Sequence, residues 1–506
     1  MNENQVFKYG IDHLTVDLAL KIANKKINGI LVEEVEKKII KSYQAIEKIV
    51  HGEKLVYSVN TGIGSLCRER ISKEETRKLS KNLLKSHSVG VGNVIDKKIA
   101  KLMLITKVHT LCFGYSGVSL EVIKRIMWHI ENDVIPSVPK QGSVGASGDL
   151  APLAHLFLPL IGLGSVSDNG EDYIETKEIL NKYGLKSIEL QAKEGLALIN
   201  GTQFMEAFSI IIAEKFKNCL DHADLIGALT LEGYLGSTQP FNEDLIKLRP
   251  HPGAIKVAKN FRLLLKDSDI VESHKNCTRV QDPYSIRCIP QVHGAARDAL
   301  KHFIEILERE LNSVTDNPII FDENTALSGG NFHGEPIALP LDYIGLAASE
   351  LGNISDRRTY LLLEGKWDLP MYLIEHSGFN TGFMIAQYTT ASLVSENKTY
   401  CFPASADSIP TSMGQEDHVS MGSISARKTL RIIKNLEKIL AIELICACQA
   451  LDFRRPLKTT PSLEKVHKYV RKSIPHLNQD VLLSNLIENA IDLIRSNELL
   501  GLINLN

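Results

Sequence analysis

The sequence lacks several features that mark particular classes of protein. Its 58 lysine and arginine residues are balanced by 60 aspartate and glutamate residues, so the chain has no basic excess for binding nucleic acid. The longest apolar run, residues 150–164, is too short to cross a bilayer, and Pro152, His155 and Pro159 interrupt it. We therefore expect no nucleic-acid partner and no membrane span, and we expect the run to form a buried core helix.

Cysteine is sparse, and its spacing forms no recognisable pairs. The sequence contains no Cys-x-x-Cys pair, and its eight cysteines are Cys67, Cys112, Cys219, Cys277, Cys288, Cys401, Cys446 and Cys448. This scatter is typical of reduced thiols rather than of a disulfide framework or a zinc site. His251 and His333 also lack partners at metal-ligand spacing, so we expect no metal. The first residues lack the basic and apolar regions of a signal peptide, and we expect a cytoplasmic protein.

Helical periodicity dominates what the sequence does contain. Apolar residues recur at helical spacing over 33–50 and over 425–451, and 341–363 is a further candidate. A short helix is expected over 15–23 with Thr15 as its N-cap. A helix of about 27 residues is about 40 Å long and is typical of a helix bundle. The pattern predicts a mainly α protein with a long central bundle and a smaller mixed N-terminal region.

The most informative local feature is the triplet Ala146-Ser147-Gly148. Small side chains and the conformational freedom of Gly148 let its amide nitrogen approach the carbonyl carbon of Ala146. Ring closure with loss of two waters, one of which takes the Ser147 hydroxyl, would give a methylidene imidazolone, which is an electrophile. Taken alone, the triplet is more simply a glycine-rich turn before a buried helix. It matches neither a P-loop nor a dinucleotide-binding loop.

In its wider context the triplet resembles the signature of the aromatic amino acid ammonia-lyases. The resemblance runs from about Tyr57 to Leu451, and its main segments are Tyr57–Gly64, Gly142–His155, Glu194–Thr202 and Gln281–Gln291. It implies a 4-methylidene-imidazol-5-one group formed from Ala146, Ser147 and Gly148 without external cofactor. It also implies a homotetramer whose subunits share active sites. We expect the prosthetic group in a region spanning 1–200, and a helical region over 201–506 that forms one catalytic unit with it.

The resemblance assigns the catalytic base to Tyr57. A phenol has a pKa of about 10, and bringing it to about 7 requires about 4 kcal/mol. One helix N-terminus supplies at best about 2 kcal/mol, so several positive sources must converge, and Arg287 is the best candidate for one. The loop departs from the family pattern at Ser58 and Ile63. Without the other motifs, Tyr57 would be read as a structural loop residue.

Further roles follow from the resemblance alone. Gln281 and Tyr284 are expected to contact the prosthetic group and the substrate. Arg287 is expected to bind the substrate carboxylate, a task suited to a bidentate guanidinium. Asn200 is expected to hydrogen-bond the imidazolone oxygen, and Phe332 to lie against the electrophile. Outside their motifs, Arg287 would be interpreted as part of a structural ion pair, Asn200 as a turn residue and Phe332 as a core aromatic.

Two further residues bear on the choice of substrate. His87 and Glu416 favour L-histidine as the substrate, because an imidazole has two nitrogens that need hydrogen-bond partners. A carboxylate buried against a phenyl ring would have no partner to offset the cost of removing it from water. Glu416 could also be a carboxylate at a helix start. We therefore expect elimination of ammonia from L-histidine to give urocanate. A tyrosine or phenylalanine lyase, a 2,3-aminomutase and an inactive amino acid sensor remain open, whereas the loop of fumarase-type lyases is absent.

Overall fold

The computed structural model describes residues 6–53, 55–62, 64 and 70–503, so residues 1–5, Ile63 and Cys67 lie outside the described part. The chain forms two compact units. The first contains Met1–Ile211, Ile304–Asp342 and Pro403–Arg427, and the second contains Ile212–Phe303, Tyr343–Phe402 and Lys428–Asn506. The units interleave along the sequence, and the expected boundary at residue 200 stays a prediction.

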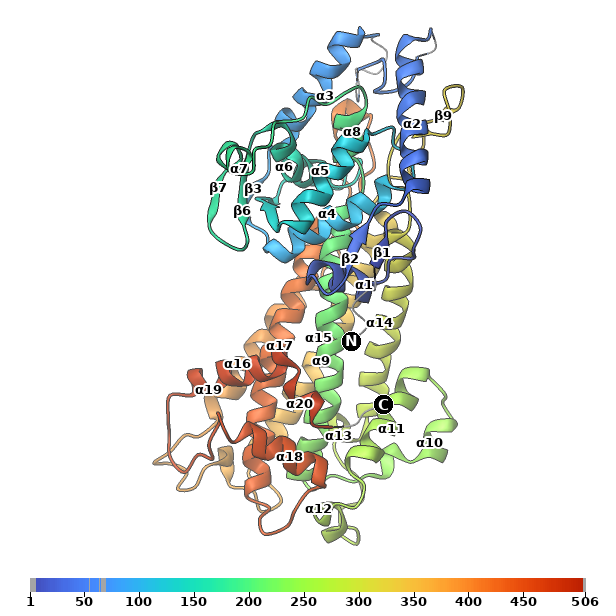
Figure 1. Cartoon of the computed structure of the whole chain (residues 1–506). Coiled ribbons are helices and arrows are strands. Elements are labelled where there is room, and N and C mark those ends of the chain that lie inside the picture. The colour runs from blue at the N-terminus through green and yellow to red at the C-terminus, as the bar shows by residue number, and fades with distance from the viewer. Residues whose placement is uncertain (1–5, 54, 63, 65–69, 504–506) are drawn as a thin grey trace. The chain divides into compact units, whose positions relative to one another are not determined.

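Helices hold 59% of the residues, which confirms the mainly α fold (Figure 1). The shorter helices of the first unit are α1 (Val16–Ala23), α2 (Glu33–His51), α3 (Lys73–His87), α4 (Lys97–Leu111), α5 (Leu120–Glu131), α6 (Leu150–Phe157), α7 (Thr176–Lys182) and α8 (Glu194–Ile199). Those of the second unit are α10 (Glu243–Lys247), α11 (Pro252–Leu264), α12 (Asp269–Ser273), α13 (Tyr284–Arg287), α16 (Met384–Tyr400), α18 (Pro461–Val470), α19 (Leu483–Ser496) and α20 (Glu498–Gly501).

Local sequence explains where the helices of the first unit begin. The Thr15 hydroxyl accepts a hydrogen bond from the Leu18 amide at the start of α1, as predicted. Ser72 and Glu75 form a capping box at the start of α3. The helix α4 is different because every residue from Ile99 to Leu111 is buried, two lysines included. A helix buried on all sides belongs to the core of its unit.

The apolar run over 150–164 differs from its prediction. It is buried, but the α-helix α6 ends at Phe157, and Leu158–Ile161 form a 3₁₀ helix with Pro159 in its first turn. A proline has no amide hydrogen for an α-helical bond, and its ring opposes continuation of the preceding helix. The turn then ends at Gly162 with a left-handed φ of 75°.

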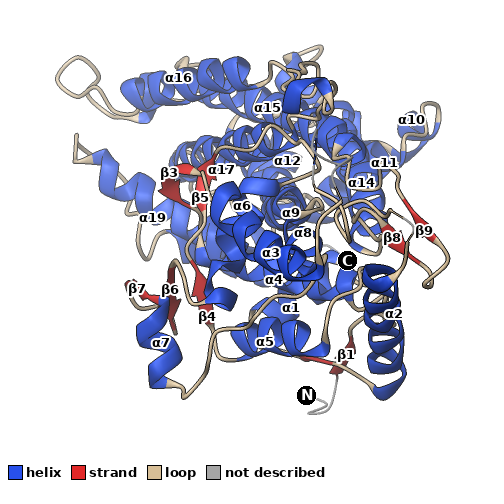
Figure 2. Ribbon diagram, turned by 90° about the horizontal axis from the view of Figure 1, so that it is seen from above, coloured by secondary structure: helices blue, strands red, loops and turns tan. Residues whose placement is uncertain are grey.

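Strands are short, and every strand in the described part belongs to the first unit (Figure 2). β1 (Val6–Lys8) pairs in parallel with β2 (Asn28–Ile30). The antiparallel pairings are β3 (Val91–Val94) with β5 (Pro139–Gln141), β6 (Ser165–Asp168) with both β4 (Val134–Pro136) and β7 (Tyr173–Glu175), and β8 (Ile319–Ile320) with β9 (Ala326–Leu327). The mixed character expected for the N-terminal region is therefore present.

Four long helices contribute most of their length to the second unit and run alongside one another: α9 (Gln203–Gly233), α14 (Ile289–Leu311), α15 (Glu335–Leu363) and α17 (Gly422–Asp452) (Figure 1). The helices predicted over 341–363 and 425–451 are confirmed as parts of α15 and α17. Arg358 on α15 contacts Glu443 on α17 at 2.6 Å, and both side chains are fully buried. No helix in the described part is long and apolar enough to cross a membrane.

Candidate active site

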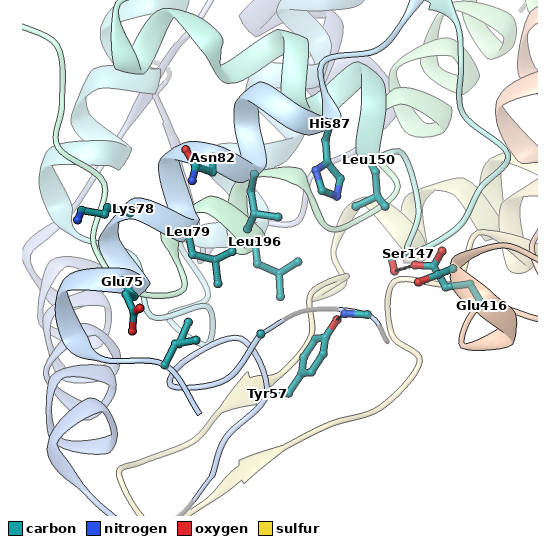
Figure 3. A pocket seen from close by; sticks show the side chains of 15 residues that line it. Tyr57, Glu75, Lys78, Leu79, Asn82, His87, Ser147, Leu150, Leu196 and Glu416 are labelled. Carbon is teal, nitrogen blue, oxygen red and sulfur yellow. Dashed lines mark hydrogen bonds between the residues drawn. The ribbon is translucent and has the colours of Figure 1, made fainter. Parts of the chain in front are cut away.

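One cavity of the first unit brings together four residues that the motifs single out. The cavity has a volume of about 780 Å³, and Tyr57, His87, Ser147 and Glu416 lie on its wall (Figure 3). They come from four distant parts of the chain: the loop after α2, the end of α3, the loop before α6 and the loop before α17. The helix α3 supplies much of the remaining wall through Glu75, Lys78, Leu79, Asn82 and Leu83.

The Ala146–Gly148 triplet has an unusual backbone. Ser147 has a φ of 49° and Gly148 a φ of 81°, both in the left-handed region that L-residues avoid. A Cβ atom at Gly148 would overlap the carbonyl group of Gly201, so no larger residue fits. The Gly148 amide donates to the Gly145 carbonyl at 3.4 Å. The loop is therefore folded back tightly.

The turn at Asn200 and Gly201 packs directly on this loop. The Gly201 amide donates to the Ser147 carbonyl at 3.2 Å, and the Gly201 carbonyl accepts from the Asp149 amide at 2.7 Å. Asn200 is the C-cap residue of α8 and is 2% exposed. Its Oδ1 has no hydrogen-bond partner among the described residues. The structure thus places Asn200 beside the triplet, with an unpaired acceptor oxygen in its carboxamide.

Glu416 is held in place by its own loop. Its Oε2 accepts from the Thr411 hydroxyl at 2.9 Å, and its backbone pairs with that of Thr411. Its Oε1 accepts from the Ser147 hydroxyl at 3.3 Å (Figure 3). The carboxylate therefore lies beside the hydroxyl that ring formation would remove.

His87 ends α3 on the same wall as Glu416. Its Nδ1 lies 3.0 Å from the Ser86 hydroxyl oxygen. Burial lowers the pKa of His87, while the negative charge of Glu416 acts in the opposite direction. Burial dominates, so His87 is mainly neutral at neutral pH and presents one nitrogen donor and one acceptor.

Tyr57 reaches the cavity from the loop that follows α2. Its hydroxyl oxygen accepts a hydrogen bond from the Gly64 amide at 3.0 Å. A hydrogen bond donated to a phenol oxygen favours the ionised form. Ser58, one of the two departures from the family pattern, has a φ of 55°, a conformation that a glycine adopts without strain.

The segment that contains Gln281, Tyr284 and Arg287 lines a different cavity, of about 600 Å³, in the second unit. The Arg287 guanidinium lies 4.4 Å from the centre of the Tyr284 ring, and Tyr284 is 70% exposed. The buried Nε of Arg287 has no hydrogen-bond partner among the described residues. Phe332 lies in the turn between β9 and α15 and is absent from the described walls of both cavities. The structure thus places Gln281, Tyr284 and Arg287 on one cavity wall, and neither Phe332 nor Tyr57 is among the described residues of that wall.

Two buried residues beside the triplet were missed by the sequence analysis. Asp149 is fully buried, and its Oδ2 accepts from the amides of Phe204 and Met205, each at 3.0 Å. Burial raises its pKa to about 7. Lys107 is buried within α4 and contacts the Asn200 carbonyl. Asp149 could have been suspected from its place inside the signature, but nothing in the sequence singles out Lys107.

Among the described residues no group of three or more histidine, cysteine, aspartate or glutamate side chains is arranged to hold a metal ion. His251 caps α11, and His333 lies 3.3 Å from His418 through ring nitrogens. The site is built instead from backbone, carboxylate, imidazole and phenol groups.

Comparison with known proteins agrees with these motifs. Residues 14–472 match the model of the family described as aromatic amino acid lyase. The chain belongs to the aromatic amino acid lyase family. It is therefore a carbon–nitrogen lyase, and the resemblance on which the sequence analysis relied is confirmed.

Relatives and solved structures align over almost the whole chain. Histidine ammonia-lyase of Natranaerobius thermophilus is 46% identical over 490 residues, which cover 95% of this chain and 96% of that protein. The crystal structure of histidine ammonia-lyase from Trypanosoma cruzi is 39% identical with a TM-score of 0.90, covering 98% of this chain and 95% of the other. Tyrosine aminomutase of Streptomyces globisporus is 33% identical with a TM-score of 0.93, covering 99% and 100%.

Proposed function

We propose that the protein eliminates ammonia from L-histidine and releases urocanate. The observation that carries this proposal is the presence of both Glu416 and His87 on the cavity wall that also holds Ser147. A carboxylate can accept a hydrogen bond from an imidazole N–H, and a neutral histidine offers a second polar contact. A phenyl ring would leave both groups unpaired. The names of the Natranaerobius thermophilus and Trypanosoma cruzi relatives support the same substrate.

We further propose that Ala146, Ser147 and Gly148 form the 4-methylidene-imidazol-5-one group, with no external cofactor. The residues present fit this group in two respects: the folded-back backbone of Ser147 and Gly148, and the absence of room for a Cβ at position 148. Once formed, the group supplies an electrophile, which natural side chains lack.

The residues of the cavity then divide the remaining work. Glu416 and His87 hold the imidazole ring of the substrate in one orientation. Tyr57 takes the β-proton onto its hydroxyl oxygen, where the hydrogen bond from the Gly64 amide favours the phenolate. The Asn200 carboxamide donates a hydrogen bond from its Nδ2 to the imidazolone oxygen. Proton removal by Tyr57 leaves the electron pair that expels the amine.

Gln281, Tyr284, Arg287 and Phe332 are proposed to complete the site from other subunits of a homotetramer. Arg287 fits the substrate carboxylate, because its buried Nε has no partner among the described residues, and a guanidinium binds a carboxylate through two parallel hydrogen bonds. It is also the proposed source of additional positive charge near Tyr57. Exposed Tyr284 fits contact with a neighbouring subunit. We place the enzyme in the cytoplasm.

The proposal is tested by incubating the purified protein with L-histidine and recording urocanate absorbance and released ammonia. L-Tyrosine and L-phenylalanine are tested in parallel, and the products are searched for β-amino acids. We expect urocanate and ammonia in equal amounts, with kcat/KM highest for L-histidine. A β-amino acid product would identify an aminomutase instead, and binding of an amino acid without turnover would identify a sensor.

A further inference from the structure

A buried polar cluster lies against the Asn200–Gly201 turn, and the chemistry proposed above does not use it. Its side chains are Lys107 on α4, Thr202, Gln203 and Glu206 around the start of α9, and Glu310 near the end of α14. Lys107, Thr202, Gln203 and Glu206 are each at most 1% exposed. Burying a lysine and two carboxyl groups is costly unless each is compensated, so the cluster requires an explanation.

Lys107 contacts the turn directly. Its Nζ donates to the Asn200 carbonyl at 2.5 Å and to the Gln203 Oε1 at 3.4 Å. The carbonyl belongs to the C-cap residue of α8, where a cation is favoured by the helix dipole. The next residue, Gly201, hydrogen-bonds the backbone on both sides of Gly148. Lys107 therefore binds one side of a turn whose other side is paired with the triplet.

The two carboxyl groups share a proton. The Thr202 hydroxyl oxygen lies 2.9 Å from the Glu206 Oε1 and 2.7 Å from the Glu310 Oε1. A hydroxyl group has one hydrogen and can donate to only one of them, so the other carboxyl must be protonated and donate to Thr202. Burial, with the charge of Glu310, raises the pKa of Glu206 to about 8, and burial also raises the pKa of Glu310.

The shared proton leaves one negative charge to balance Lys107. Burial lowers the pKa of Lys107 to about 8, and the charges of Asp316 and Glu206 oppose this decrease. The neighbouring lysine, Lys193, has a partner of its own, because its Nζ lies 2.7 Å from the Asp316 Oδ2. Lys107 is therefore mainly charged at neutral pH and donates a strong hydrogen bond.

We propose that Lys107, balanced by Glu206, Thr202 and Glu310, is a positioning residue that holds the Asn200–Gly201 turn against Ala146–Gly148. Through this turn it orients the Asn200 carboxamide, and this inference rests on the role proposed for Asn200. Lys107 itself touches neither substrate nor prosthetic group. Its loss changes the geometry of the turn rather than the shape of the substrate pocket.

The test compares Lys107→Met with Lys101→Met. Lys101 lies on the same helix, is 4% exposed and pairs with Asp133 at 2.6 Å, so the control also removes a buried lysine with a partner. Each purified protein is measured for kcat and KM with L-histidine, for thermal unfolding, and by intact mass for the fraction that has lost two waters. Values of kcat are expressed per matured subunit.

We expect Lys107→Met to lower kcat by about 10- to 100-fold, the effect of losing one charge-assisted hydrogen bond, with KM within about 2-fold of wild type. The matured fraction should also fall. Lys101→Met should keep the wild-type kcat and matured fraction, whatever its change in melting temperature. Equal kcat values for the two variants, or a rise in KM without a fall in kcat, would overturn the proposal.

Two further measurements keep the result decisive. If Lys107→Met does not fold, Lys107→Gln is measured in its place, because glutamine leaves a shorter, neutral hydrogen-bond donor. We expect it to lose less kcat than the about 10- to 100-fold expected for Lys107→Met, at unchanged KM. A wild-type kcat in Lys107→Gln would overturn the proposal. The wild-type protein separates the two levels of inference. If it neither loses two waters nor forms urocanate, the proposed function fails; if it does both and Lys107→Met behaves like Lys101→Met, only the role of Lys107 fails.

Discussion

The substitution Glu416→Gln tests how the cavity selects its substrate. In the wild-type protein the Thr411 hydroxyl donates to the Glu416 carboxylate at 2.9 Å. The amide of glutamine retains an oxygen that can accept this hydrogen bond, so the loop should keep its structure. What is lost is the negative charge facing the substrate ring. A hydrogen bond to a charged group contributes about 1.5–3 kcal/mol, so kcat/KM for L-histidine should fall by about 10- to 150-fold.

The assay is the ratio of kcat/KM for L-histidine to that for L-tyrosine. We expect this ratio to fall, because turnover of tyrosine does not need the charge. Asp417→Asn is the matched control, since it removes a carboxylate from the adjacent exposed residue, which is not on the cavity wall. Intact mass must show the same matured fraction in each variant, because Glu416 also contacts the Ser147 hydroxyl. An unchanged ratio in Glu416→Gln would refute the reasoning that this carboxylate recognises the imidazole.

Three other substitutions address the base, the triplet and the buried carboxyl pair. Tyr57→Phe should keep the fold and the loss of two waters but reduce kcat by about 10²- to 10⁴-fold, and near wild-type turnover would place the base elsewhere. Gly148→Ala should abolish maturation of the prosthetic group, because the new Cβ would overlap the Gly201 carbonyl. The control Gly170→Ala should mature normally, because Gly170 has a similar φ of 87° but open space around it. Normal maturation of both variants would show that the tight loop is not required. Glu206→Gln should flatten the pH dependence of stability. The pKa of Glu206 is about 8 in the folded state and about 4.3 in the unfolded state, so the folded protein binds the extra proton and the free energy of unfolding falls as pH rises between these values. Denaturant titrations should show this slope reduced by up to about 1.4 kcal/mol per pH unit in the variant, and an identical slope would mean that Glu206 is ionised throughout.

Much of the fold was predictable because it depends on local signals. The Thr15 cap and the apolar stripes of α2 and α17 follow from residue spacing alone, and the structure confirms them. The apolar run over 150–164 was predicted less well, because hydrophobic periodicity does not indicate where Pro159 ends the α-helix and a 3₁₀ helix begins. In the candidate site, Tyr57, Ser147 and Asn200 were found through motifs.

Lys107 could not be found in this way. It lies in the middle of an apolar helix pattern, and its importance comes from a contact with a residue 93 positions away. A burial pattern predicts that α4 is in the core but not which backbone carbonyl a buried lysine reaches. Sequence spacing also could not predict that Gln281, Tyr284 and Arg287 line a different cavity from Tyr57. A motif indicates the role of a residue but not its position in the folded chain.

We propose above that the triplet Ala146–Gly148 becomes the electrophile of a histidine-eliminating enzyme. The most direct measurement is the mass of the proteolytic peptide that contains residues 146–148, taken from a preparation that converts L-histidine to urocanate. We expect this peptide to lack the mass of two water molecules, and we expect Ser147→Ala to leave the backbone unmodified and to abolish turnover. An unmodified peptide throughout an active preparation would contradict this proposal.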